Sequence, residues 1–280
     1  MNHLGHHRLS LCAVASALLL MASCGSKGPE PPKPGSPAFV WAVAQDSYKA
    51  GDYLKTNENL DQLLGGKSDF VARAAPVKLV LGAGLAQGYI EMADKFETGT
   101  KATRSNPAVF RKQMSEYRRQ ARAVSMQVVE AAHQHMNKWK DPNVTFVFPF
   151  PAGSVDEAAG LSKVTSGMQL PASEVDKMAR LMLQRGVVRV ASRVAGFPKD
   201  TEKARAAFKP EDTQLPREQF VLALVNTLYE ISGLFGQKKM NEPDRLKMFY
   251  QVALAGLETL PPSKEKKDLT DKIQKALKTV

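Results

Sequence analysis

The sequence PAVFRKQMSEYRRQARAVSMQVVEAAHQHMNKW, residues Pro107–Trp139, carries the longest helical pattern in the chain. Its apolar positions recur at alternating steps of four and three residues, which places them on one face of a helix. Such a stripe packs against antiparallel neighbours or forms a coiled-coil dimer, and we expect packing within the chain because other helices also need a partner. The stripe consists of Phe110, Met114, Tyr117, Ala121, Val124, Val128, Ala131 and His135.

Signals for helix ends recur along the rest of the chain. Ser36-Pro37 and Asn106-Pro107 each combine a capping residue with a proline in the first helical position. Ser154–Glu157 has the pattern of a capping box, and Asn241 precedes an acidic first turn. Only Val144–Phe150 is patterned as an extended segment, which is too little for a real sheet. The sequence therefore predicts an all-α fold built of antiparallel helix hairpins.

One of these hairpins resembles a tetratricopeptide repeat. The resemblance rests on Ala44, Gly51, Tyr53, Leu60 and Leu63, and no second copy follows at the period of that repeat. Small Ala44 would let two helices approach, Gly51 would permit the turn, and Tyr53 would pack between the helices. The resemblance implies a tetratricopeptide-like or α-solenoid-like bundle, and we expect it to form a single domain over residues 38–280.

The N-terminal residues have the layout of a secretory signal. Arg8 precedes the apolar run Leu9–Ala22, which is shorter than the about 20 residues that span a bilayer and suits a signal-peptide core. The following sequence LMASC, residues Leu20–Cys24, resembles the lipobox of bacterial lipoproteins. That resemblance implies a signal peptide over residues 1–23 and a mature chain that is held on a membrane by an acylated Cys24.

The residues after the lipobox predict how the body is attached. Residues 24–37 are rich in proline and glycine and contain nothing to bury, which is typical of a semi-extended tether. Gly25-Ser26 lacks the aspartate that retains lipoproteins in the inner membrane of some Gram-negative bacteria. The resemblance therefore places the protein in the bacterial cell envelope and, in such an organism, favours the outer membrane facing the periplasm.

Cysteine content and charge restrict the chemistry. The only cysteines are Cys12, inside the signal, and Cys24, so the mature chain offers no thiol for a disulfide, a nucleophile or a metal site. The net charge is +11, or +10 without Arg8. A basic chain often binds nucleic acid, but export argues against that partner. We expect an envelope protein, an anionic lipid or a cell-wall polymer instead.

The segment LVLGAGLAQG, residues Leu79–Gly88, looks like a strand that enters a glycine-rich phosphate loop. A dinucleotide site would need a small residue where Gln87 stands and alternating strands and helices around it, and both are missing. Gly84 and Gly88 lie one helical turn apart, so the alternative is a helix that another helix approaches closely. We favour this alternative and expect no cofactor.

Two arginine clusters are the candidate sites for an anion or an acidic partner. Arg185, Arg189 and Arg193 recur every four residues on one predicted helix, and Arg118 and Arg122 belong to a second cluster. Guanidinium groups suit carboxylate and phosphate because their donors form a planar fork. The alternative is that both clusters are solvated faces with salt bridges to neighbouring helices.

Aromatic and imidazole side chains supply the remaining candidates. Phe146, Phe148 and Phe150 form a candidate docking loop, and the favoured alternative is a buried plug over the apolar end of a helix stack. His133 and His135 lie two positions apart, so they point to different sides of a helix and do not form a metal pair. No catalytic triad or paired-carboxylate motif is visible. We expect no metal site, an exposed His133 and a His135 beside the apolar stripe.

These features predict a non-enzymatic scaffold or adaptor lipoprotein that binds a protein partner through its α-helical surface. A second resemblance concerns layout: a lipoprotein signal, one repeat-like hairpin, Leu79–Ala93 and then a long basic helix. This order is similar to the tetratricopeptide-like lipoprotein component of tripartite substrate-binding transporters, which implies a ligand-binding accessory protein. An enclosed apolar pocket would favour the transporter accessory, and an open groove would favour the adaptor.

Overall fold

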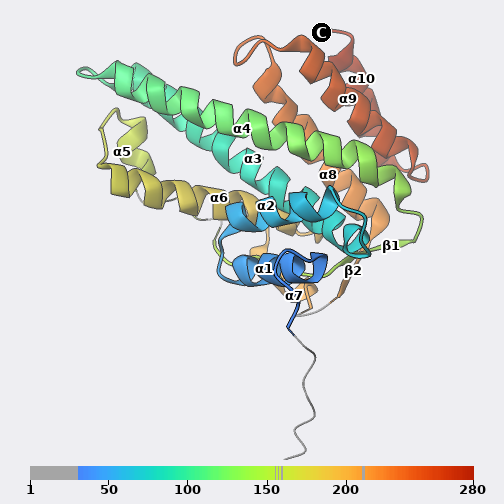
Figure 1. The fold of residues 1–280 in the computed structure, drawn as a ribbon. Coiled ribbons are helices and arrows are strands. Elements are labelled where there is room, and N and C mark those ends of the chain that lie inside the picture. The colour runs from blue at the N-terminus through green and yellow to red at the C-terminus, as the bar shows by residue number, and fades with distance from the viewer. Residues whose placement is uncertain (1–30, 155, 157, 159, 210–211) are drawn as a thin grey trace, which may run out of the picture. The chain divides into compact units, whose positions relative to one another are not determined.

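The structure, a computed structural model, describes residues 31–154, 156, 158, 160–209 and 212–280. Residues Lys33–Val280 form one compact unit (Figure 1). The predicted signal peptide, residues 1–23, and the predicted lipidation site Cys24 lie outside the described residues, as does the first part of the tether.

The described part of the chain contains ten α-helices and one two-stranded antiparallel ribbon, which confirms the predicted all-α class. The helices are α1 (Pro37–Lys49), α2 (Tyr53–Leu64), α3 (Phe70–Ala102), α4 (Pro107–His135), α5 (Leu161–Thr165), α6 (Ala172–Val194), α7 (Thr201–Ala207), α8 (Arg217–Ser232), α9 (Pro243–Glu258) and α10 (Lys264–Leu277). The strands are β1 (Asn143–Phe146) and β2 (Thr213–Pro216).

Helices α3 and α4 form a long central hairpin (Figure 1). The predicted helix over Pro107–Trp139 is confirmed as α4, which is followed by a short 3-10 turn, Met136–Lys138. Its stripe is buried except at Met114 and Val124, which are half-buried. Phe96 on α3 joins the two helices through ring contacts to Phe110, at 5.9 Å between centroids, and to Tyr117, at 5.5 Å. The stripe therefore packs within the chain, as expected.

Helices α1 and α2 form the predicted hairpin beside α3. Ser36 caps α1 by accepting the backbone N–H of Phe39, and Gly51 turns the chain with φ of +73°, a value that favours glycine. Ala44 is fully buried, and Tyr53 is buried with its hydroxyl donating to the carbonyl of Ala152 at 2.8 Å. Gly51 thus has the predicted turn role, and the ring of Tyr53 packs on that of Tyr48 of α1, with centroids 5.3 Å apart.

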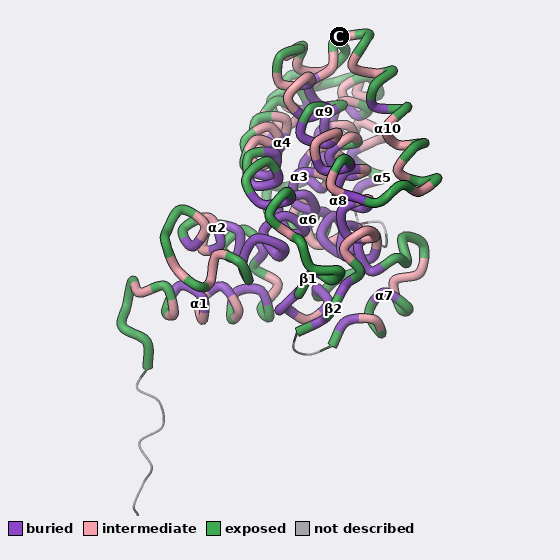
Figure 2. Tube along the Cα trace, turned by 90° about the vertical axis from the view of Figure 1, so that its right-hand side faces the viewer, coloured by how far each residue is buried: buried purple, intermediate pink, exposed green. Residues whose placement is uncertain are grey.

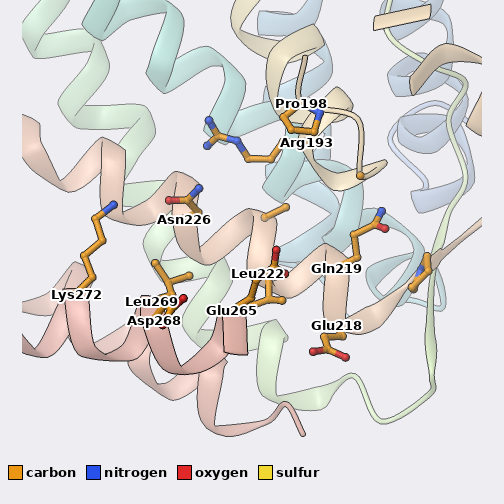
Figure 3. A pocket seen from close by; sticks show the side chains of 13 residues that line it. Arg193, Pro198, Glu218, Gln219, Leu222, Asn226, Glu265, Asp268, Leu269 and Lys272 are labelled. Atoms are coloured by element: carbon orange, nitrogen blue, oxygen red, sulfur yellow. The ribbon is translucent and has the colours of Figure 1, made fainter. Parts of the chain in front are cut away.

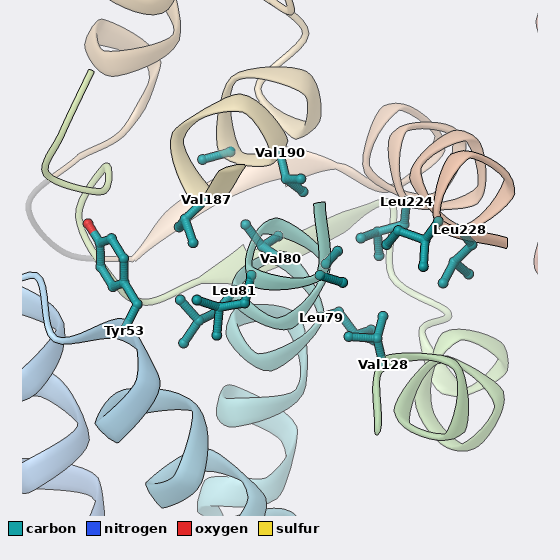
Figure 4. Packing of buried hydrophobic residues seen from close by; sticks show 14 of the residues in the cluster. Tyr53, Leu79, Val80, Leu81, Val128, Val187, Val190, Leu224 and Leu228 are labelled. Carbon is teal, nitrogen blue, oxygen red and sulfur yellow. The ribbon is translucent and has the colours of Figure 1, made fainter. Parts of the chain in front are cut away.

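Helix α6 crosses α3 at its glycines. A Cβ atom placed on Gly88 would lie 2.8 Å from the carbonyl oxygen of Met182, and one on Gly84 would overlap the backbone of Val187. The segment Leu79–Gly88 is therefore the middle of a helix that approaches another helix closely, as the favoured alternative predicts. Figure 4 shows Val187 and Val190 of α6 directed toward Leu79–Leu81 of α3.

Helix α8 lies against α3 and α6, and α9 and α10 complete the C-terminal part (Figure 2). The ribbon leads directly into α8: Asn143 pairs with Pro216 at the last position of β2, and the backbone N–H of Arg217 donates to the carbonyl of Pro142 at 2.8 Å. The ribbon thereby fixes where α8 begins. Figure 2 shows α3 as the buried centre around which α4, α6 and α8 are placed.

One predicted helix start is wrong, and one predicted cap is displaced by a single residue. No helix begins after Ser154, because Asp156 and Ala158 are not helical and the next helix among the described residues begins at Leu161; Val155 and Glu157 lie outside the described residues. Ser154 instead donates its hydroxyl to Asp156, whose backbone N–H donates back to that hydroxyl at 3.0 Å, so the two residues form a local turn. Asn241 has φ of +54°, which asparagine tolerates, and the capping position of α9 is Glu242.

Candidate functional site

A groove of about 690 Å³ lies between the C-terminal end of α6, helix α8 and helix α10 (Figure 3). It is open to solvent, and we call it the α8–α10 groove. Its lining mixes charged, amide, proline and leucine side chains. These residues are Arg193, Gly196, Pro198, Pro216, Glu218, Gln219, Leu222, Ala223, Asn226, Glu265, Asp268, Leu269 and Lys272.

Helix α8 supplies the central wall of the groove. Its core face is buried and includes Leu224 and Leu228 (Figure 4). The opposite face carries Glu218, Leu222 and Asn226 at steps of four residues, so these side chains share one side of the helix. The groove is thus formed by the side of an amphipathic helix that does not enter the core.

Helix α10 supplies the facing wall. The hydroxyl of Ser263 accepts the backbone N–H of Lys266 and begins the helix, and the fully buried Ile273 anchors it against the rest of the chain. The residues that line the groove are Glu265, Asp268, Leu269 and Lys272, which fall on one face at helical spacing. On this wall the half-buried Leu269 therefore lies between Glu265 and Lys272, with Asp268 beside it (Figure 3).

The two cations of the groove are held by the protein itself. Arg193 donates from Nη1 to Oε2 of Glu230 at 2.8 Å and to the hydroxyl of Thr227 at 2.9 Å. Lys272 places its Nζ over the ring of Tyr229, 4.3 Å from the centroid. Both positive charges are therefore engaged before any ligand binds.

The three carboxylates of the groove are free by comparison. Glu218, Glu265 and Asp268 form no ion pair and accept no hydrogen bond from any residue that the structure describes. The amide of Asn226 likewise has no partner in the described part of the chain, and it extends into the groove in Figure 3. The groove consequently presents uncompensated negative charge beside an apolar strip.

The predicted arginine ladder lies together on α6 but faces carboxylates of the same chain. Arg185 donates to Oε1 of Glu91 at 2.9 Å and Arg189 to Oε2 of Glu91 at 3.1 Å. Arg193 pairs with Glu230, as described above. The ladder is therefore an internal ion-pair network between α6, α3 and α8, which agrees with the salt-bridge alternative, and only Arg193 reaches the groove.

The second arginine cluster is paired in the same way. Arg118 donates to Glu97 on α3 at 2.7 Å, and Arg122 donates to Glu242 at the start of α9 at 2.9 Å. These contacts tie α4 to its neighbours on both sides. Among the described residues, this cluster shares no carboxylate with the arginine ladder of α6.

The three phenylalanines of the candidate docking loop are buried, with exposed fractions of 1% for Phe146, 1% for Phe148 and 8% for Phe150. Phe148 contacts Tyr48, with centroids 4.7 Å apart, and Phe146 and Phe150 both pack on Phe208. The prediction of an exposed docking loop at these three residues is therefore wrong. The aromatic side chains instead act as the plug between α1 and α7 that the favoured alternative predicts.

Lys78 is a buried cation that sequence reasoning missed. It is fully buried on α3, where its Nζ lies 2.5 Å from Asp61 and donates to Asn57 at 2.9 Å. Burial lowers the pKa of Lys78, while the hydrogen bond and charge of Asp61 oppose that shift. The cluster fastens α2 to α3. Its signal in the sequence is a lysine inside the apolar run PVKLVL, residues 76–81.

His133 is exposed and His135 is buried, as predicted. Within the ranges described above, no group of three or more histidine, cysteine, aspartate or glutamate side chains is placed to hold a metal ion. No helix in the same ranges has both the length and the apolar character that a membrane crossing requires.

A second hollow, of about 560 Å³, lies between α1, the start of α3 and the chain after β1. Its charged and hydroxyl groups are mostly engaged within the chain: the hydroxyl of Tyr48 donates to the carbonyl of Pro149 at 3.0 Å, and Arg73 lies 3.7 Å from Asp212, while Gln45 and Lys49 have no partner among the described residues. The α8–α10 groove is the better candidate because its carboxylates and amide remain available.

Comparison with protein-family models, with curated proteins and with solved structures found no match.

Proposed function

We propose that this protein is a membrane-anchored envelope lipoprotein that acts as a non-enzymatic scaffold or adaptor and binds a protein partner in the α8–α10 groove. The observation that carries the proposal is the form of this groove. It is open, and it alternates leucines with carboxylates and an amide along two helices. Small-molecule sites are typically concave, largely apolar and enclosing, whereas a side-by-side pair of helix faces suits a polypeptide segment.

The anchor rests on the N-terminal sequence. The short apolar run Leu9–Ala22 and the LMASC sequence at Leu20–Cys24 support acylation of Cys24, followed by a proline-rich tether. Two or more acyl chains would hold the protein stably on a membrane. The resemblance of residues 44–63 to one tetratricopeptide repeat supports the adaptor class in the same proposal, since repeats of that type present helical surfaces to other proteins.

A site-specific crosslinking experiment in intact membranes tests the proposal. A photoreactive residue is placed at Asn226 in the groove and, as the matched control, at Gln251, which is exposed on α9. We expect a discrete protein adduct from position 226 and none of that adduct from position 251. If position 226 gives only adducts that position 251 also gives, the proposed site is contradicted.

The anchor is tested separately by mass spectrometry of the N-terminal peptide and by fractionation of a Cys24→Ala variant. We expect an acylated Cys24 and loss of the variant from the membrane fraction. An unmodified Cys24 would contradict lipid anchoring without bearing on the groove.

A further inference from the structure

We propose that the segment bound in the α8–α10 groove is a basic polypeptide, with lysine or arginine side chains next to an apolar residue. This inference rests on the proposed function, because it names the chemistry of the partner at the same groove. It follows from the carboxylates left free in the groove, from the apolar strip beside them and from the ion pair that engages Arg193 within the chain.

The free charges set the sign of the partner. Glu218 stands on one wall and Glu265 and Asp268 stand on the other, and none of them is neutralised by a described residue. The whole chain, by contrast, carries a net charge of +11. A groove of opposite sign to its surroundings selects a basic segment and repels nucleic acid and anionic lipid surfaces.

The two groove cations offset only part of this charge. Arg193 is bonded to Glu230 and Thr227, and its side chain is only 17% exposed. Lys272 is placed over the ring of Tyr229. Arg193 is thus neutralised within the chain, whereas the exposed Lys272 keeps its positive charge at one end of the groove, so three carboxylates outnumber one free cation among the described residues of the lining.

The apolar strip sets the second requirement. Leu222 on α8 and Leu269 on α10 are both half-buried and face the groove from opposite walls (Figure 3). An apolar side chain of the partner would cover them, and that cover would exclude water from the neighbouring ion pairs. Ion pairs in a partly dehydrated groove are stronger than the same pairs on an open surface.

A divalent cation is a poorer occupant than a basic segment. The three carboxylates come from two facing helices, and no cluster of metal-ligating side chains is found in the described ranges. Lysine and arginine side chains reach separate carboxylates one at a time, which fits acidic groups that are spread along a groove.

Binding of defined peptides to the full-length protein in non-ionic detergent tests the inference. The probes are fluorescent peptides of equal length that alternate lysine with leucine or glutamate with leucine. The test variant combines Glu218→Gln, Glu265→Gln and Asp268→Asn. The control variant combines Glu58→Gln, Glu130→Gln and Glu258→Gln, which removes the same charge from exposed positions without a described partner.

We expect the lysine–leucine peptide to bind the native protein and to lose affinity as salt increases. Its affinity should fall at least about tenfold in the test variant, since several ion pairs are lost together, and less than about twofold in the control variant. Equal binding of the glutamate–leucine peptide, or equal loss in both variants, would overturn the inference. Circular dichroism of both variants verifies that each is folded.

The same variants separate this inference from the proposed function. A crosslink from position 226 that persists unchanged in the test variant would show that the groove binds a partner without its carboxylates, which overturns the basic-segment inference and leaves the adaptor in place. Absence of the crosslink in the native protein would overturn the adaptor itself.

Discussion

Gly84 on α3 and Gly186 on α6 are in direct backbone contact: a Cβ atom on Gly186 would overlap the carbonyl oxygen of Gly84. A Cβ atom on Gly84 would in turn overlap the backbone of Val187. Backbone atoms cannot move aside as a flexible side chain does, so the crossing of these helices depends on the absence of side chains at both positions.

Gly186→Ala is expected to destabilise the protein by about 1–3 kcal/mol because the added methyl group forces α3 and α6 apart. Gly233→Ala is the matched control, since a Cβ atom there would meet nothing within 4 Å. Urea unfolding followed by circular dichroism measures both. Equal stability of the two variants would mean that the helices do not cross this closely.

The shared pairing of Arg185 and Arg189 with Glu91 gives a second prediction. Glu91→Gln removes the only carboxylate that both guanidinium groups contact in the described structure, at a position where the Glu91 side chain is 21% exposed. We expect a loss of about 1–2 kcal/mol, less than for a fully buried pair because solvent reaches the site.

Glu116→Gln is the control for Glu91→Gln. Glu116 pairs with Arg119 three residues further along the surface of α4, an arrangement that contributes little to stability. The free energy of unfolding, measured with denaturant, should therefore change little in this variant. A Glu91→Gln variant as stable as Glu116→Gln would show that the ladder is not a structural network.

Much of the fold could be predicted from the sequence because its signals are local. The stripe of Pro107–Trp139 follows from helical periodicity, and Gly51 turns the α1–α2 hairpin because few other residues tolerate its backbone conformation. The wrong helix start at Ser154 has a local cause too. Its hydroxyl contacts Asp156 two residues away, and that turn competes with the capping geometry.

The groove could not be predicted because it depends on helices far apart in the chain. Glu218 belongs to α8 and Asp268 to α10, and only the packing of α9 and α10 on α8 makes them face each other. The four-residue spacing of the arginine ladder predicts that its members share one face of a helix. The acceptor Glu91 lies on a different helix, so the spacing does not identify it. A sequence pattern predicts which face of a helix carries a charged side chain. It does not predict which residue of another helix will pair with that side chain.

The aromatic plug gives a third prediction. Phe148→Ala removes a ring that is 1% exposed and packs on Trp41 and Tyr48, so it leaves a cavity and should cost about 3–5 kcal/mol. Phe197→Ala removes the same ring from a site that is 36% exposed and should cost about 1 kcal/mol or less. Thermal unfolding measures both changes. Similar effects of the two variants would indicate that the 146–150 segment leaves the core in solution.

The last prediction concerns pH and His135. Burial lowers the pKa of His135, and the positive charge of Lys138 lowers it further. The neutral imidazole is therefore favoured in the folded protein, whereas the unfolded chain takes up a proton as the pH falls through about 6.5. Since the unfolded state binds more protons in that range, the contribution of His135 to stability is present above about pH 6.5, declines as the pH falls and becomes constant below the lowered pKa.

Urea unfolding of His135→Gln and His133→Gln between pH 7.5 and pH 5 isolates this contribution, because all other titratable groups are common to both variants. His133 is exposed on the same helix and serves as the matched control. His135→Gln should show a smaller loss of unfolding free energy on acidification than His133→Gln. If both variants lose the same unfolding free energy on acidification, burial does not hold His135 neutral. The C-terminal end of α4 must then open to solvent, because His135 itself is only 7% exposed in the folded structure.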